Sequence, residues 1–263
     1  MNYRHHVPLA GIAALTRPRV PVPVPVPSSC DVLASVLGRC FAVEYQPIID
    51  LATGATIAHE ALSRFFDVQG RPVPPGAVFA RLHEDPSLLL YVEAETKRFQ
   101  MENAPEGPLH LNVDPDSFHA GRNGHGGNAL LDLLQSHSAP VVVEVIETMT
   151  FADARLAHEL VRALRARHMV VALDDVGAPD TLISLEVLKD ADVLKLDSSW
   201  FVRIADPRER AILDALLSLA RRLGARTVLE GVETAAQLEI AVALGVDAVQ
   251  GFLYRGQFTT RAA

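Results

Sequence analysis

Residues 141–146 read VVVEVI and residues 169–173 read MVVAL, and a stretch with the apolar spacing of a helix, Ala152–Arg167, lies between them. Each short run is apolar at nearly every position, as strands are when both faces of their sheet are covered. Strands of this kind that alternate with helices are typical of a parallel sheet with helices packed on both sides. The segment therefore predicts an α/β protein.

The same alternation extends through the chain in both directions. Helices are expected at Asp31–Cys40 (with Asp31 as its N-terminal cap), Pro86–Asn103, Ala152–Arg167, Pro207–Leu223 and Ala235–Leu244, with a short one within Leu182–Leu188. Strands are expected at Phe41–Ile49, Thr56–Ser63, Leu109–Val113, Val141–Ile146, Met169–Leu173, Asp192–Leu196, Thr227–Leu229 and Ala248–Phe252. These eight strands are the number that closes a TIM-type barrel. Because the turn Ala52–Gly54 is too tight to join parallel strands, we predict a modified (β/α)8 barrel with one antiparallel strand.

Length and composition agree with one barrel of ordinary globular character. The chain has 263 residues, 49% hydrophobic and 21% charged, and a barrel needs roughly 250 residues. The net charge of -8 offers no basic surface for nucleic acid, so we expect no DNA partner. No apolar run approaches the roughly 18 residues of a membrane span. Two cysteines, Cys30 and Cys40, are too few for a disulfide framework, so we expect a cytoplasmic protein.

The N-terminal segment has a different composition from the rest of the chain. Val20–Pro27 reads VPVPVPVP, a pattern that favours polyproline II without internal hydrogen bonds. We therefore expect residues 1–30 to be a disordered tail or a stiff spacer, and residues 31–263 to form the barrel domain.

Polar residues interrupt or end nearly every predicted strand. They are Glu60, Asn112, Glu144, Asp174, Asp175, Lys195, Glu230 and Gln250. Ionised groups are costly to bury unless they are paired or bind a metal, and strand ends converge on one face of a barrel. Carboxylates with an Asn carbonyl suit Mg²⁺ or Mn²⁺, and the adjacent pair Asp174-Asp175 suits two metals. His59, beside Glu60, should face the other side of its strand and act in packing.

These residues stand within motifs that occur in a characteristic order. The motifs are Tyr45–Asp50 (YQPIID), Glu60-Ala61-Leu62 followed by Arg64, Leu111–Val113, Glu144–Glu147, Asp174–Gly177, Leu194–Asp197, Glu230–Thr234 and Gln250–Phe252. From about Phe41 to the C-terminus, the chain resembles the EAL domain family, whose members open cyclic di-GMP. The spacing of 21 positions between Asp174 and Lys195 also agrees with that family.

The resemblance implies metal-dependent hydrolysis of cyclic di-GMP to linear pGpG, with two Mg²⁺ or Mn²⁺ ions per site. It also implies a homodimer. The implied metal ligands are Glu60, Asn112, Glu144, Asp174, Asp175 and Glu230. The implied catalytic residues are Glu60, Lys195, Glu230 and Asp175. Gln46, Arg64 and Gln250 are the implied substrate-binding residues, and Glu147 would anchor the loop after the Asp pair.

One segment departs from the family pattern and leaves alternatives open. After Asp175 the chain reads VGAPDTLI over residues 176–183, with Pro179 where the family has a glycine. The departure favours, as an alternative, a weak or inactive cyclic di-GMP receptor or a protein-interaction module. A third hypothesis is a different metal-dependent barrel enzyme, such as another phosphodiester hydrolase or an enolase-like enzyme. The former commonly has histidines at its strand ends, which this sequence lacks, and the latter needs a capping domain. Lys195 could instead form a core ion pair with Asp197 or another neighbouring residue.

Overall fold

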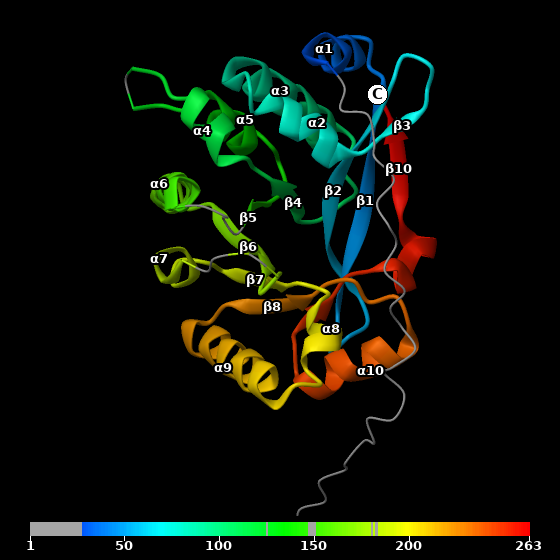
Figure 1. Cartoon of the computed structure of the whole chain (residues 1–263), viewed down its shortest axis with the longest axis vertical. Coiled ribbons are helices and arrows are strands. Elements are labelled where there is room, and N and C mark those ends of the chain that lie inside the picture. The colour runs from blue at the N-terminus through cyan, green and yellow to red at the C-terminus, as the bar shows by residue number, and fades with distance from the viewer. Residues whose placement is uncertain (1–27, 125, 147–150, 180, 182–183) are drawn as a thin grey trace, which may run out of the picture.

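The computed structural model describes residues 28–124, 126–146, 151–179, 181 and 184–263 (Figure 1). Residues 1–27 of the predicted N-terminal tail and Glu147 therefore lie outside the described residues. Helix α1 (Ser29–Leu37) begins two residues earlier than predicted, because Ser28 caps it instead of Asp31. Asp31 takes the third helical position, where its side chain accepts a hydrogen bond from the Ser28 N–H at 3.0 Å.

Eight strands close the predicted barrel. They are β1 (Phe41–Asp50), β2 (Thr56–Phe66), β4 (Leu109–Asn112), β5 (Val141–Ile146), β6 (Val170–Val176), β7 (Val193–Leu196), β8 (Arg226–Leu229) and β9 (Ala248–Val249). Their order is β1-β9-β8-β7-β6-β5-β4-β2, and β2 pairs back with β1. Strand β1 runs antiparallel to both neighbours, while the other pairs within the barrel are parallel. The prediction of a modified barrel with one antiparallel strand is confirmed.

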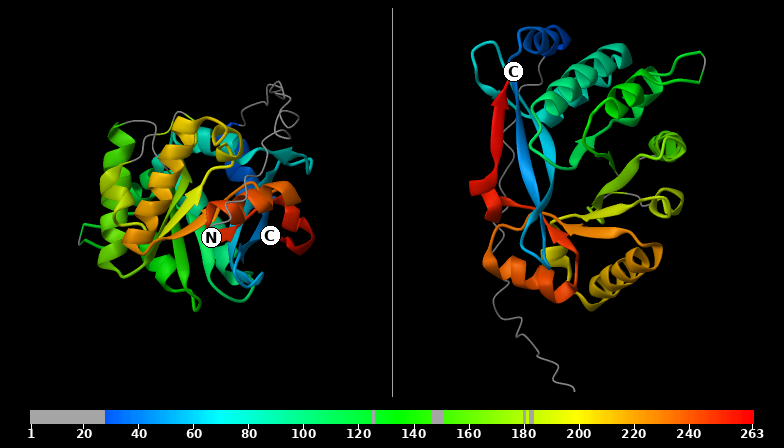
Figure 2. Two further views of the ribbon diagram at one scale, coloured as in Figure 1. Left: turned by 90° about the horizontal axis from the view of Figure 1, so that it is seen from below. Right: turned by 180° about the vertical axis from the view of Figure 1, so that it is seen from behind.

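Helices cover the outside of this barrel, and Figures 1 and 2 show α6, α7 and α9 along the outer side of β5–β8. The helices are α2 (Pro75–Leu82), α3 (Pro86–Glu102), α4 (Pro115–Ala120), α5 (Ala129–Gln135), α6 (Phe151–Ala166), α7 (Leu185–Leu188), α8 (Trp200–Arg203), α9 (Pro207–Leu223) and α10 (Ala235–Leu244). The bounds of α9 and α10 are those predicted. The shorter α2, α4, α5 and α8 were not predicted, because one or two turns give too little apolar periodicity. In the described part of the chain, no helix is both long and apolar enough to cross a bilayer.

The last strand is shorter than predicted. Strand β9 ends at Val249, and the chain then enters a 3-10 helix, η2 (Phe252–Gln257). The Gln250 carbonyl accepts from the Val232 N–H at 3.0 Å, so the backbone here bonds to the segment after β8 instead of extending the ladder. Two further short strands extend the sheet: β3 (Pro72–Val73) pairs with β2, and β10 (Thr259–Ala262) pairs with β1.

A layer of apolar side chains fills the barrel beneath its polar end. Its members are Ile48, Ala58, Val142, Ala172, Val193, Val228 and Ala248. Each of them lies two residues from a predicted site residue, which is on the same strand or directly follows it. Because side chains two apart in a strand share a face, the predicted site residues form the next layer inside the barrel. A larger apolar cluster, including Val143, Leu173 and Leu194, packs between the strands and the helices.

Candidate functional site

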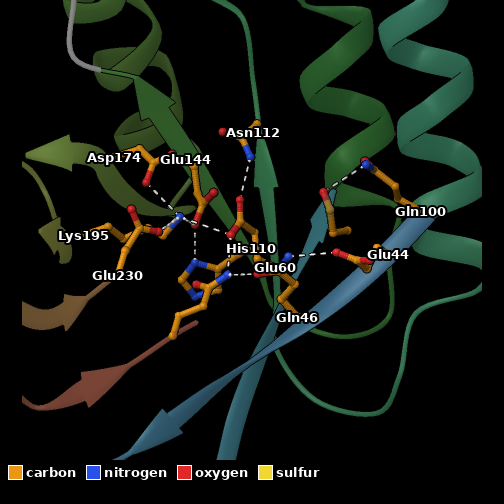
Figure 3. Close-up of polar contacts among 12 residues, drawn as sticks. Glu44, Gln46, Glu60, Gln100, His110, Asn112, Glu144, Asp174, Lys195 and Glu230 are labelled. Carbon is orange, nitrogen blue, oxygen red and sulfur yellow. Dashed lines mark hydrogen bonds and ion pairs between the residues drawn. The ribbon is translucent and has the colours of Figure 1, made fainter. Parts of the chain in front are cut away.

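The ammonium group of Lys195 lies at the centre of the polar layer (Figure 3). Its Nζ is 2.7 Å from Glu144 Oε1, 2.8 Å from Asp174 Oδ1 and 2.9 Å from Glu230 Oε1. Glu60 Oε2 is farther away, at 3.5 Å. Lys195 is thus paired with carboxylates from four other strands or strand ends and not with Asp197, whose Oδ1 accepts from the Ser199 N–H at 2.9 Å.

Glu60 joins the metal-ligand candidates to the substrate-binding candidates. Its Oε1 accepts from Asn112 Nδ2 at 3.0 Å, and its Oε2 accepts from Gln250 Nε2 at 2.6 Å. The same Gln250 nitrogen lies 3.4 Å from Gln46 Oε1. The structure therefore brings Gln46, Gln250 and Asn112 together around a single buried carboxylate.

Arg64 is held at the edge of this network by a residue that the sequence analysis missed. Arg64 Nη2 donates to Glu44 Oε1 at 2.7 Å, and Gln46 Nε2 donates to the same oxygen at 2.8 Å. Glu44 lies two residues before Gln46 on β1, so it shares an inward face with Gln46. That two-residue spacing is the signal that could have found it.

His110 is the second missed residue. It lies two residues before Asn112 on β4 and is 4% exposed. Its Nδ1 is 2.9 Å from Glu144 Oε1. Burial, and then the Lys195 charge, lower the pKa of His110 to about 3, so the ring is neutral and the tautomer decides which of the two groups donates in its contact with Glu144. Its inward position was readable from the strand pattern, but its partner on the neighbouring strand was not.

Asp174 and Asp175 reach one site because β6 is irregular between them. Adjacent residues of a regular strand point to opposite faces. Here the pairing of β6 with β7 shifts register between Leu173 and Val176, and Asp175 has φ 53°, in the left-handed region. A bulge of this kind turns the side chain of Asp175 toward the same end of the barrel as Asp174. A non-glycine residue in this conformation costs on the order of 1 kcal/mol.

Two groups of carboxylates have the spacing of cation sites. Ligand atoms of Glu60, Glu144 and Asp174 lie within 4.8 Å of one another, as do those of Asp174, Asp175 and Glu230. The groups share Asp174. Glu144 Oε2 is buried without a hydrogen-bond partner, as is Gln250 Oε1. Unsatisfied buried oxygens next to hard carboxylate ligands fit Mg²⁺ or Mn²⁺.

The pKa values indicate that the site's own positive charge is too small to keep all of its carboxyl groups ionised. Burial, and then neighbouring carboxylates, raise the pKa of Asp175 to about 6 and of Glu230 to about 8, although Lys195 opposes the shift. Burial and Glu60 raise the pKa of Glu144 well above its usual value. Burial would also raise the pKa of Glu60, but Lys195 and the hydrogen bond from Gln250 outweigh it and lower this pKa to about 2. One ammonium group therefore keeps only part of this cluster ionised, and dications would ionise the rest.

Comparison with known proteins agrees with this arrangement. A family model described as EAL domain matches residues 31–256. The chain is 30% identical over 236 residues to the bifunctional diguanylate cyclase/cyclic di-GMP phosphodiesterase MucR of Pseudomonas aeruginosa, a match that covers 85% of this chain and 34% of MucR. The chain thus spans about a third of that curated relative.

Two solved structures share the fold. The PaMucR phosphodiesterase in its c-di-GMP complex is 27% identical, with a TM-score of 0.68, and the match covers 85% of this chain and 94% of that one. Klebsiella pneumoniae BlrP1 in a manganese/cy-diGMP complex is 25% identical, with a TM-score of 0.65, and the match covers 82% and 55% of the two chains. With the matched family model spanning most of its length, this chain belongs to the EAL domain family.

Proposed function

We propose that this protein hydrolyses cyclic di-GMP to linear pGpG with the help of Mg²⁺ or Mn²⁺. The observation that carries the proposal is the pair of carboxylate groups that share Asp174 at one end of the barrel. Relatives named as cyclic di-GMP phosphodiesterases, and a related manganese/cy-diGMP complex, support the choice of substrate and metal.

Each carboxylate group would hold one ion. Glu60, Asn112, Glu144 and Asp174 would ligate the first, and Asp174, Asp175 and Glu230 the second. When bound, two such ions lower the pKa of a water molecule and stabilise negative charge on a phosphoryl group. Asn112 now donates its amide N–H to Glu60, and it would contribute its amide oxygen to the first ion.

The chain's own residues handle the proton and the charge. Water adds to phosphorus, the bond to the ribose 3′ oxygen breaks, and the departing oxygen receives one proton. Asp175 and Glu230, which belong to the second carboxylate group, would accept the proton that water loses. Lys195 would stabilise the charge that develops beside them.

Substrate-binding roles follow from the network around Glu60. Arg64 would exchange Glu44 for a substrate phosphate, since a guanidinium suits bidentate phosphate contact. Gln46 and Gln250 would present amide groups to the nucleotide while Gln250 keeps Glu60 in place.

Two further proposals follow from the family. Glu147 would anchor the loop after the Asp pair, and the protein would form a homodimer.

The test is incubation of the purified protein with cyclic di-GMP and either Mn²⁺ or Mg²⁺, followed by chromatography of the products. We expect pGpG from the wild-type protein, loss of at least about a hundredfold in rate for Glu60→Gln, and no product in EDTA. Glu159→Gln, which removes an exposed ion pair with Arg122, is the matched control. Metal-dependent binding of intact nucleotide without turnover would contradict the proposal and favour a receptor.

A further inference from the structure

The turn that follows Asp175 has an unusual backbone. Asp175 has φ 53° and Gly177 has φ 83°, so two left-handed residues flank Val176. Such conformations persist only where surrounding groups determine them. Asp175 lies within the irregular part of β6, so the direction of its side chain depends on this turn.

Trp200, at the start of α8, packs directly against the turn and is 1% exposed. Its Nε1 donates to the Val176 carbonyl at 2.9 Å. A Cβ placed on Gly177 would lie 2.4 Å from Cζ2 of the same ring. The indole thus fixes one carbonyl of the turn and leaves room only for glycine at the next position.

Arg203 holds the next carbonyl. Its Nη1 donates to the Gly177 carbonyl, and its guanidinium carbon lies 4.0 Å from the centre of the Trp200 ring. The same guanidinium is fixed from the other side by Glu209 Oε2, at 2.6 Å from Nη2 and 3.1 Å from Nε. A planar guanidinium that stacks on an indole and pairs with a carboxylate has one preferred orientation.

We infer that Trp200 and Arg203 are positioning residues that hold Asp175 in place for the second metal ion, with Glu209 orienting Arg203. They bind the carbonyls of the two residues that follow Asp175 and so fix the conformation of the turn. That turn directs the Asp175 carboxylate toward Asp174 and Glu230. These contacts are made to the carbonyls of Val176 and Gly177, two residues and more before Pro179. The inference rests on the proposed metal-dependent function.

The experiment measures binding of Mn²⁺ alone, by calorimetry, to the full chain and to matched variants. Trp200→Phe keeps an aromatic side chain but removes the donor, and Arg203→Met removes both the donor and the charge. We expect each to weaken one of the two Mn²⁺ binding steps by about tenfold, which is the low end of the loss caused by removing a group that orients a metal ligand. Arg203→Lys keeps a donor and should lose less. Arg210→Met is the control, because it removes an exposed arginine pair with Asp214 on α9, away from the turn.

The outcomes separate positioning from simple packing. Variants that lower the melting temperature but bind Mn²⁺ like the wild type would overturn the inference. If Arg203→Met fails to fold, the comparison of Trp200→Phe with the wild type decides. Wild-type protein that binds Mn²⁺ but yields no pGpG would reject the proposed function alone, whereas wild-type protein that binds no Mn²⁺ would reject both.

Discussion

Among single residues, Glu44 has the clearest effect on how Arg64 could meet a substrate. Arg64 is about one-third exposed and is paired with Glu44 at 2.7 Å. A phosphate that binds Arg64 must displace this partner, and an exposed pair of this kind contributes about 0.5–1 kcal/mol. We expect Glu44→Gln to lower KM for cyclic di-GMP about two- to fivefold with kcat unchanged, and Arg64→Ala to raise KM. A higher KM in Glu44→Gln would show instead that Glu44 orients Arg64 for the substrate.

Lys195 balances the charge of the cluster when no metal is bound. It is 0% exposed, and four carboxylates lie within 3.5 Å of its ammonium group. Removal of one partner from a buried ionic cluster costs about 3–5 kcal/mol. We expect Lys195→Met to lower the free energy of unfolding in EDTA by about 3 kcal/mol, measured by urea denaturation. Lys189→Met, which breaks an exposed pair with Glu186, should change it by less than about 0.5 kcal/mol.

Among the structural elements, β6 carries one member of the apolar layer and two metal-ligand candidates, Asp174 and Asp175, in one short strand. Ala172 belongs to the apolar layer and lies two residues before Asp174 on the same face. A larger side chain there would push against the polar layer above it, at a cost of about 1–3 kcal/mol. We expect Ala172→Leu to reduce pGpG formation more than tenfold at saturating Mn²⁺.

Helix α9 offers the matched control for this change. Ala220 is equally buried but packs in the outer cluster between helices and strands. Ala220→Leu should destabilise the protein by a similar amount while its rate per folded molecule stays near that of the wild type. Equal rate losses in the two variants would contradict the idea that the apolar layer inside the barrel positions the metal-ligand candidates above it.

The molecule as a whole should respond to pH in a direction set by Glu230 and Asp175. Their folded-state pKa values, about 8 and about 6, are raised above the usual values of carboxyl groups. The folded protein therefore binds more protons than the unfolded chain over this range, and its stability falls as pH rises. Burial lowers the pKa values of His59 and His110, so these two rings oppose the trend, but only near pH 6.5, where the unfolded chain still protonates them.

We accordingly expect the free energy of unfolding in EDTA to fall by about 1–2 kcal/mol from pH 6.5 to pH 8. Saturating Mn²⁺ or Glu230→Gln should remove most of this slope, because either one removes the buried, poorly compensated carboxylate charge. Chemical denaturation at fixed pH values provides the measurement. A stability that rises over this interval in EDTA would contradict the assigned pKa shifts.

Much of the architecture was predictable because it depends on local patterns. Apolar runs that alternate with long amphipathic segments identified all eight barrel strands, and the tight turn after β1 identified the antiparallel one. The long helices α9 and α10 were predicted to the residue. Short helices such as α4 and α8 were not, since their few turns are stabilised by tertiary packing more than by periodicity.

The site residues, too, fall into those that local sequence patterns place and those that only the folded structure brings together. The amino-acid order alone was enough to place Glu60, Asn112, Glu144, Asp174 and Lys195 on inward positions of consecutive strands, and their roles as ligands and catalysts stay predictions. Only the folded barrel shows that Lys195 pairs with four carboxylates rather than with Asp197, and that Glu44 and His110 belong to the network. Only it shows the bulge that brings Asp175 beside Asp174. The physical reason is that strand periodicity is a local property of the chain, whereas partners across strands depend on register, closure and the turns that neighbouring helices hold.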